Sequence, residues 1–154
     1  MEIYDLITPA CVVANLRATS KRQALQELAR RAAALAKLDE HKVFETLWER
    51  EQLGTTGIGA GTAVPHGRLS DLSRPVALFA RLEKPVDFDA IDSQPVDLIF
   101  LLLTPSDASA DHLKALARIS RLLRNRATCT KLRGTNEADA IYALLTDRAT
   151  SNAA

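Results

Sequence analysis

The segment that most restricts the fold of this chain is the apolar stretch at residues 96–104, VDLIFLLLT. A short run that is continuously apolar is typical of a strand buried on both faces, which occurs in sheets covered by helices on both sides. The run is too short to span a bilayer, because a membrane helix needs about 20 apolar residues. A second strand is predicted at residues 75–82, PVALFARL, with a polar loop, VDFDAIDSQP, between the two.

Helical patterns lie on both sides of this strand region. Ser20 and Gln23 have the spacing of a capping box, so the first clear helix is predicted to begin there. A second helix is predicted to start after Asp39 and to end at Gly54. Two more are expected near the C-terminus, after the segment SDASAD and after Thr135. Helices before and after a set of strands predict a single-domain α/β sandwich, followed by a frayed tail, TSNAA.

The composition favours one ordinary globular domain and argues against several functions. The chain has 154 residues, and its 20 basic and 19 acidic residues leave a net charge of +1. A charge this small argues against wholesale binding to nucleic acid or to an anionic membrane. The N-terminus lacks the basic and apolar regions of a signal peptide. We therefore expect a cytoplasmic protein that has no membrane span and does not bind nucleic acid.

The sequence contains no complete motif for binding a nucleotide cofactor or a metal ion. The glycine-rich segment fits neither GxGxxG, since Thr62 or Val64 stands where the third glycine is needed, nor the GxxxxGK[ST] phosphate loop. Four acids in and just after the polar loop do not match a calcium loop, and the histidines and cysteines lack the spacing of zinc ligands. These acids are Asp87, Asp89, Asp92 and Asp97. Cys11 and Cys129 are expected to be reduced thiols that act as small hydrophobes.

His66 is the histidine with the most distinctive surroundings. Five of the six glycines fall within the fourteen residues GTTGIGAGTAVPHG, and Pro65 fixes the backbone on entry to His66. Such surroundings leave the ring accessible, although a turn histidine that merely ends a strand fits the local pattern equally well. His112 falls near the start of a predicted helix, where free N–H groups favour anions. His41 is expected to be a solvent-exposed side chain.

A basic stretch runs along the third predicted helix and beyond it, through Arg118, Arg121, Arg124, Arg126, Lys131 and Arg133. Such a stretch is usually a solvated face. The alternative is a docking patch for an acidic partner. Nucleic acid is a poor candidate for that partner, because no aromatic residues are interleaved with the basic ones.

Three blocks of this sequence resemble a known family. They are GTTGIGAGTAVPHGR, ALFARLEKPVDFDAIDSQPVDLIFLLLTP and DHLKALARISRLL. The chain resembles the enzyme IIA proteins of the mannitol/fructose class (type 2) in the bacterial phosphotransferase system. Within that class it is most similar to the nitrogen-regulatory branch, and the resemblance covers nearly the whole chain. It implies one IIA domain at residues 1–148, with a central mixed β-sheet and helices on both faces, and a disordered tail at residues 149–154.

The resemblance also implies a phosphoryl-transfer site that contains no cofactor and no metal. His66 would be the phosphoryl acceptor, forming a tele-phosphohistidine, with His112 and Arg50 beside it. The physical chemistry is suitable, since a neutral imidazole is a competent nucleophile near pH 7. Phosphoryl transfer requires mainly positioning and stabilisation of charge. His112 would donate a hydrogen bond to the phosphoryl oxygens without itself carrying the group.

The family resemblance also implies two kinds of partner, a phosphocarrier that donates the group and proteins that the chain regulates. The leading hypothesis is a phosphorylated transferase component that receives its group from an HPr-type phosphocarrier and regulates sensor kinases or potassium-transport systems. A sugar-specific IIA protein that feeds a IIB domain is the alternative, and the lack of an attached IIB or membrane segment favours regulation. A third possibility is an interaction module that has lost phosphotransfer, against which the retention of His66, His112 and Arg50 argues.

Overall fold

The computed structural model describes residues 1–146, so the predicted tail at 149–154 and the last two residues of the predicted domain lie outside the described residues. The helices are α1 (Ile3–Leu6), α2 (Lys21–Ala36), α3 (Glu40–Leu53), α4 (Ser109–Arg124), α5 (Arg126–Arg133) and α6 (Ala138–Thr146), with a 3-10 turn, η1, at Pro9–Cys11. The strands are β1 (Val12–Leu16), β2 (Gly57–Gly59), β3 (Thr62–Ala63), β4 (His66–Leu69), β5 (Val76–Val86) and β6 (Val96–Pro105).

The strands form one mixed sheet around β6. Its hydrogen-bonded order is β1-β5-β6-β3-β2, and β4 also pairs with β6, beyond the point where β3 pairs. β1 runs parallel to β5, β5 is antiparallel to β6, and both β3 and β4 run parallel to β6. Two short parallel strands in succession along one edge of β6 place the segment 64–66 directly against the middle of that strand.

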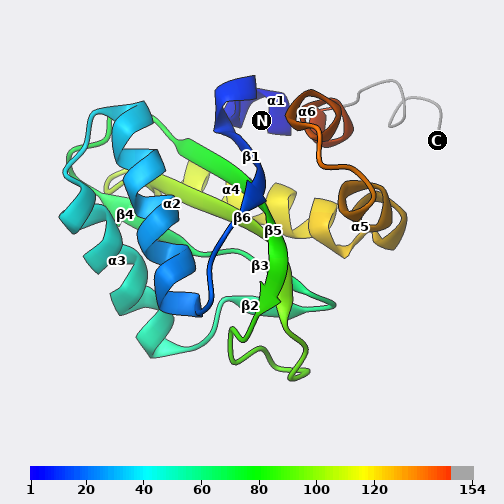
Figure 1. Ribbon diagram of the computed structural model, residues 1–154. Helices are drawn as coiled ribbons and strands as arrows, with labels where there is room; N and C mark the ends of the chain where they lie inside the picture. The colour runs from blue at the N-terminus through cyan, green and yellow to red at the C-terminus, as the bar shows by residue number, and fades with distance from the viewer. Residues whose placement is uncertain (147–154) are drawn as a thin grey trace.

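Helices cover the two faces of the sheet, as the sequence predicts. In Figure 1, α2 and α3 lie together on one side, while α4, α5 and α6 lie on the other. The strand β6 between them is buried along nearly its whole length, which confirms the interpretation of its continuous apolar run. Phe79 of β5 and Phe100 of β6 pack edge to face at a centroid distance of 5.6 Å in this core.

The helix boundaries follow local capping chemistry. Ser20 caps α2 by accepting from the Gln23 N–H, but the Gln23 side chain accepts from Thr19 instead of completing a capping box with Ser20. Asp39 caps α3 as predicted, and α3 ends at Leu53 before Gly54. The third predicted helix begins within the SDASAD segment, at Ser109. It stops at Asn125, whose side chain caps a separate helix, α5, that the sequence analysis does not distinguish.

At two positions of the 54–67 cluster the structure requires glycine, one for its backbone conformation and one for the close approach of a helix. Gly61 has a φ of 78°, in the left-handed region that other residues rarely adopt. Gly67 in β4 faces α3, and a Cβ atom at that position would lie 2.5 Å from Cγ2 of Thr46. The absence of a side chain at Gly67 therefore permits α3 to approach β4 closely, and this contact brings the end of α3 to His66.

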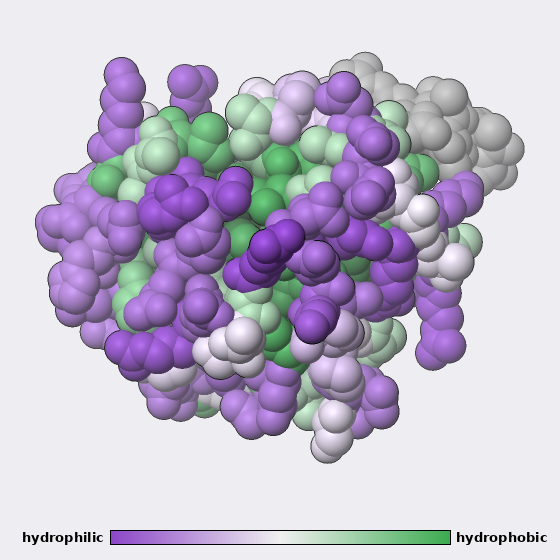
Figure 2. Space-filling model, in the orientation of Figure 1, coloured by the Kyte–Doolittle hydropathy of each residue, from purple (hydrophilic) through white to green (hydrophobic). Residues whose placement is uncertain are grey.

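The surface is mainly hydrophilic on the face shown in Figure 2, with hydrophobic residues visible between the polar ones. Leu53 and Ile91 are the most exposed large hydrophobic residues of the described part, at 85% and 86%. Within residues 1–146, no helix is both long and apolar enough to cross a membrane. Cys11 and Cys129 are both buried and unbridged, in agreement with their interpretation as small hydrophobic residues.

Candidate functional site

His66 is the first residue of β4, where the chain turns from Pro65 into the sheet. Its backbone is fixed by the parallel pairing with Leu102, and its side chain is half-buried. The ring nitrogen Nδ1 lies 2.8 Å from the carbonyl oxygen of Val64. A carbonyl can only accept, so Nδ1 carries the proton and donates it to Val64. In this neutral tautomer the lone pair that can act as a nucleophile is on Nε2.

Arg50 approaches that lone pair from the last turn of α3. Its Nε donates to Nε2 of His66 at 3.3 Å, and its Nη1 donates to the carbonyl oxygen of Gly54 at 2.8 Å. The guanidinium is therefore anchored at the helix end by one N–H group while another faces the imidazole. A planar fork of donors in this position is suited to bind phosphoryl oxygens beside Nε2.

His112 forms the second wall of the site from the first turn of α4. It is only 5% exposed, and its ring centroid lies 5.6 Å from that of His66, with the planes tilted by 58°. Its Nδ1 is hydrogen-bonded to the buried hydroxyl of Thr104 in β6. If the hydroxyl donates, its own proton is satisfied, and His112 carries its proton on Nε2, where it is available as a donor.

The surroundings keep both histidines neutral near pH 7. Burial lowers the pKa of His66, and Arg50 and Arg68 lower it further, against the opposite effects of the Val64 carbonyl and Glu51. Burial also lowers the pKa of His112 to about 4, with smaller contributions from His66 and Arg68. A neutral imidazole with an unprotonated Nε2 is the nucleophilic form, so the site maintains His66 in its reactive state.

Arg68 is a site residue that the sequence analysis misses. It lies two residues after His66 on β4, and its Nη1 donates to the hydroxyl of Ser109 at 3.0 Å. Alternate residues of a strand share a face, so the spacing of His66 and Arg68 is the signal that would have found it. Arg68 brings a second guanidinium beside the pair of histidines and ties β4 to the start of α4.

The remaining predicted residues lie outside this group. His41 is in the first turn of α3, where its side chain is 77% exposed and pairs with Glu45 at 2.9 Å. The exposed position of His41 is as predicted, and it is far from Arg50 at the other end of the same helix. His66, His112 and Arg50, by contrast, come together from β4, α4 and α3.

Three of the four acids lie in the loop between β5 and β6, Asp97 lies in β6, and all four contact other groups of the protein. Asp89 pairs with Lys21, Asp97 pairs with Arg133, and Asp92 accepts from the Ala60 N–H. Asp87 accepts from the backbone N–H of Asp89. The contacts of Asp89 and Asp92 tie the loop between β5 and β6 to α2 and to the β2–β3 turn, and the contact of Asp97 ties β6 to α5.

The basic stretch is divided between two helices. Arg118 pairs with Glu2, and Arg133 pairs with Asp97, so these two side chains have structural partners within the chain. Four others are exposed along the end of α4 and on α5: Arg121, Arg124, Arg126 and Lys131. Their exposure is compatible both with a solvated face and with a docking patch, so the second interpretation stays a prediction.

Comparison with known proteins gives consistent matches along the chain. Residues 5–148 match the family described as "Phosphoenolpyruvate-dependent sugar phosphotransferase system, EIIA 2". The nitrogen regulatory protein of Bradyrhizobium diazoefficiens is 54% identical over 145 residues, which cover 94% of this chain and 95% of that protein. The solved structure of the nitrogen regulatory protein IIA-Ntr from Neisseria meningitidis has a TM-score of 0.88 at 33% identity, covering 94% of this chain and 99% of the other.

A more distant structure shares the fold alone. It is the complex of enzyme IIA-Mtl with phosphorylated enzyme IIB-Mtl from Escherichia coli, matched with a TM-score of 0.77 at 17% identity. The match covers 92% of this chain and 98% of the matched chain. These similarities agree with the mixed sheet flanked by helices that the sequence predicts.

Proposed function

This chain belongs to the phosphoenolpyruvate-dependent sugar phosphotransferase system EIIA 2 family, and we propose that it carries a phosphoryl group on Nε2 of His66. The main support for this assignment is the hydrogen bond from Nδ1 of His66 to the Val64 carbonyl, at 2.8 Å. It leaves the lone pair on Nε2, the nitrogen that faces Arg50. The product would be the tele-phosphohistidine implied by the sequence resemblance.

The transfer step needs no change of protonation at the attacking nitrogen. Nε2 of His66 forms a bond to phosphorus as the donor's nitrogen–phosphorus bond breaks, and the electron pair of the broken bond returns to the donor nitrogen. The incoming group brings about −1.5 to −2 charges if it resembles other protein phosphates. Arg50 and Arg68 supply positive charge, and the start of α4 supplies a favourable dipole.

We assign the donor by chemical class as an HPr-type phosphohistidine carrier. The regulatory branch is supported by relatives whose name is nitrogen regulatory protein, including the one at 54% identity. Its targets would be sensor kinases or potassium-transport systems that distinguish the phosphorylated form from the unphosphorylated one. The alternative is a IIA protein that passes the group to a IIB partner, and it is favoured by the shared fold of the IIA-Mtl chain bound to phosphorylated IIB-Mtl.

The direct test of this function is phosphoryl transfer to the purified chain. We expect incubation with phosphoenolpyruvate, enzyme I and an HPr-type carrier to add one phosphoryl group, detected by intact mass and lost on acid treatment. Omission of the carrier is the control and should prevent the reaction. If the complete system adds no group, the proposed function is wrong.

His112 is proposed to donate a hydrogen bond from Nε2 to the phosphoryl oxygens. The His112→Ala protein is expected to accept the group about tenfold more slowly, the effect of losing about 1.4 kcal/mol in the transition state. Thr104→Val separates the orientation of the His112 ring from the ability of that ring to donate a hydrogen bond, because it removes the hydroxyl partner of His112 but keeps the ring. Phosphorylation of His112→Ala at the wild-type rate would contradict the role.

A further inference from the structure

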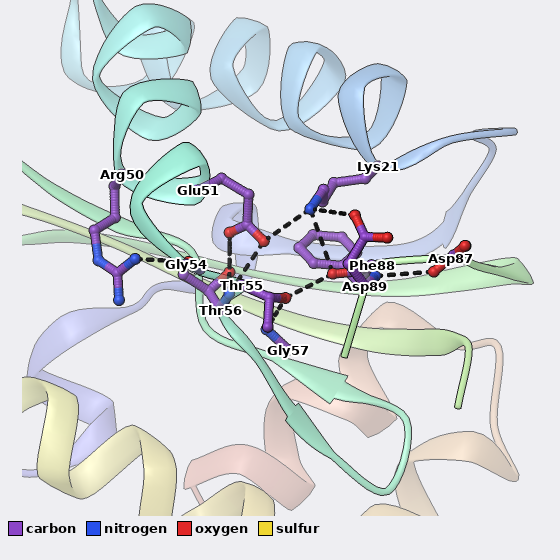
Figure 3. Close-up of polar contacts among 10 residues, drawn as sticks. All are labelled: Lys21, Arg50, Glu51, Gly54, Thr55, Thr56, Gly57, Asp87, Phe88 and Asp89. Carbon is purple, nitrogen blue, oxygen red and sulfur yellow. Dashed lines mark hydrogen bonds and ion pairs between the residues drawn. The ribbon is translucent and has the colours of Figure 1, made fainter. Parts of the chain in front are cut away.

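A buried carboxylate lies directly beside the site and has no role in the mechanism above. Glu51 follows Arg50 in the last turn of α3, and its buried side chain points toward Thr56 and Lys21 (Figure 3). Its two oxygens lie 3.0 and 3.1 Å from the backbone N–H of Thr56, and one of them also accepts from the Thr56 hydroxyl at 2.6 Å. Three contacts to one residue fix the turn between α3 and β2.

Lys21 supplies the countercharge for this carboxylate. Its Nζ lies 3.3 Å from Oε1 of Glu51 and 2.9 Å from the Asp89 carboxylate, and the lysine side chain is only 13% exposed. The same Nζ donates to the carbonyl oxygen of Phe88 at 3.4 Å. A buried carboxylate needs a cation and hydrogen bonds to compensate its desolvation, and Glu51 has both. Glu51 therefore places a carboxylate, paired with Lys21, beside the turn.

The turn held by Glu51 leads to His66 through two hydrogen bonds. The carbonyl oxygen of Thr56 accepts from the Val64 N–H at 2.9 Å. The carbonyl oxygen of Val64, in turn, accepts from Nδ1 of His66 at 2.8 Å. Thr56, which Glu51 holds, and Val64, whose carbonyl fixes the His66 tautomer, are thus joined by one backbone hydrogen bond.

The same turn also anchors Arg50. The carbonyl oxygen of Gly54 accepts from Nη1 of Arg50 at 2.8 Å, while the Gly54 N–H donates to the backbone carbonyl of Glu51 at 3.2 Å. Movement of this turn would displace the partner of Arg50 as well as the partner of His66. The Arg50 guanidinium and the His66 imidazole, which meet at Nε2, therefore both depend on a segment that Glu51 holds.

We propose that Glu51 is a positioning residue for phosphoryl transfer, which orients His66 through Thr56 and Val64 and stabilises the ring electrostatically after Nε2 has reacted. This inference rests on the proposed function of His66. When Nε2 bonds to phosphorus while Nδ1 keeps its proton, the ring becomes formally positive. A nearby carboxylate favours that state, as a buried aspartate favours the imidazolium in serine proteases. Glu51 touches neither the ring nor the phosphoryl group.

The test compares Glu51→Gln with the wild-type protein by NMR of the imidazole nitrogens and by the rate of phosphoryl acceptance. Glutamine keeps the size of the side chain but removes its charge. We expect the His66 population to shift away from the Nδ1–H tautomer and acceptance to slow about tenfold. The pKa of His66 should fall further, because Glu51 and the Val64 carbonyl both raise it in the wild-type protein.

The direction of that pKa change separates positioning from a general loosening of the structure. Burial is the largest cause of the low pKa of His66, so a loosened site that admits water would raise it toward 6.5. A rise, or an unchanged tautomer and rate, would overturn the proposal. The matched control is Glu49→Gln, which removes the same charge from an exposed position of the same helix and should leave all three readouts unchanged.

A second pair of variants keeps the proposal testable if Glu51→Gln does not fold. Thr56→Val removes the hydroxyl that donates to Glu51 but keeps the backbone N–H, whereas Thr56→Ser keeps both donors. We expect Thr56→Val to show a smaller tautomer shift in the same direction and Thr56→Ser to show none. Equal behaviour of the two variants would overturn the proposal. Failure of the wild-type protein to accept phosphoryl would refute the proposed function instead, and the tautomer measurement would still report on Glu51.

Discussion

The His66→Gln protein is expected to gain no detectable phosphoryl group under conditions in which the wild-type protein gains one. Glutamine is neutral and polar like the imidazole, but its amide nitrogen has no nucleophilic lone pair, so no bond to phosphorus can form. We do not expect His112 to substitute, because it is 5% exposed and its Nε2 carries the proton when Thr104 donates to Nδ1. Intact mass after incubation with the complete phosphotransfer system measures the outcome.

The control for this variant is His41→Gln. His41 is an exposed histidine that pairs with Glu45 on the solvent side of α3, so its replacement should leave both phosphoryl acceptance and thermal unfolding unchanged. His66→Gln should also unfold at nearly the wild-type temperature, because the ring is half-buried and its polar contacts are with two groups, the Val64 carbonyl and Nε of Arg50. An adduct that persists on folded His66→Gln would place the acceptor elsewhere.

The sequence predicts those elements whose burial is uniform or whose ends carry strong capping residues. β6 is recognisable because nearly every position faces other protein, so the run is apolar without alternation. α2 and α3 are recognisable by Ser20, Asp39 and Gly54 at their ends. β1 is missed because its five residues, VVANL, show neither alternation nor flanking turn signals. Its status as a strand depends on pairing with β5, which no local pattern encodes.

The site is harder to predict, because its geometry is set by long-range pairing. Local sequence leaves His66 ambiguous between an accessible acceptor and an ordinary turn histidine. The orientation of its ring depends on the Val64 carbonyl, and the backbone of Val64 is held by Thr56 in a different segment. His112 reaches the site only because α4 returns after β6, on which Thr104 lies beside it. Family resemblance supplies these residues where periodicity and capping cannot.

The second large effect is expected at Arg50. The Arg50→Met protein should accept phosphoryl about 10² to 10³ times more slowly, the usual effect of removing one preorganised donor from a developing anion. Methionine keeps much of the side-chain volume but loses both the donor to Nε2 of His66 and the donor to the Gly54 carbonyl. Single-turnover transfer from the phosphorylated carrier measures the change. Arg30→Met, at an exposed position of α2 where the guanidinium pairs with Glu27, is the matched control and should have no effect.

The pH dependence of the Arg50→Met rate distinguishes two causes of this defect. Arg50 lowers the pKa of His66, so its removal raises that pKa and increases the fraction of protonated, unreactive imidazole as the pH falls. At about pH 8, a histidine with an ordinary pKa is almost fully neutral, so this contribution disappears. A defect of the expected size at about pH 8 therefore reports lost stabilisation of the phosphoryl charge. If the variant recovered the wild-type rate there, Arg50 would act only by keeping His66 neutral, and its assignment as a phosphoryl ligand would be wrong.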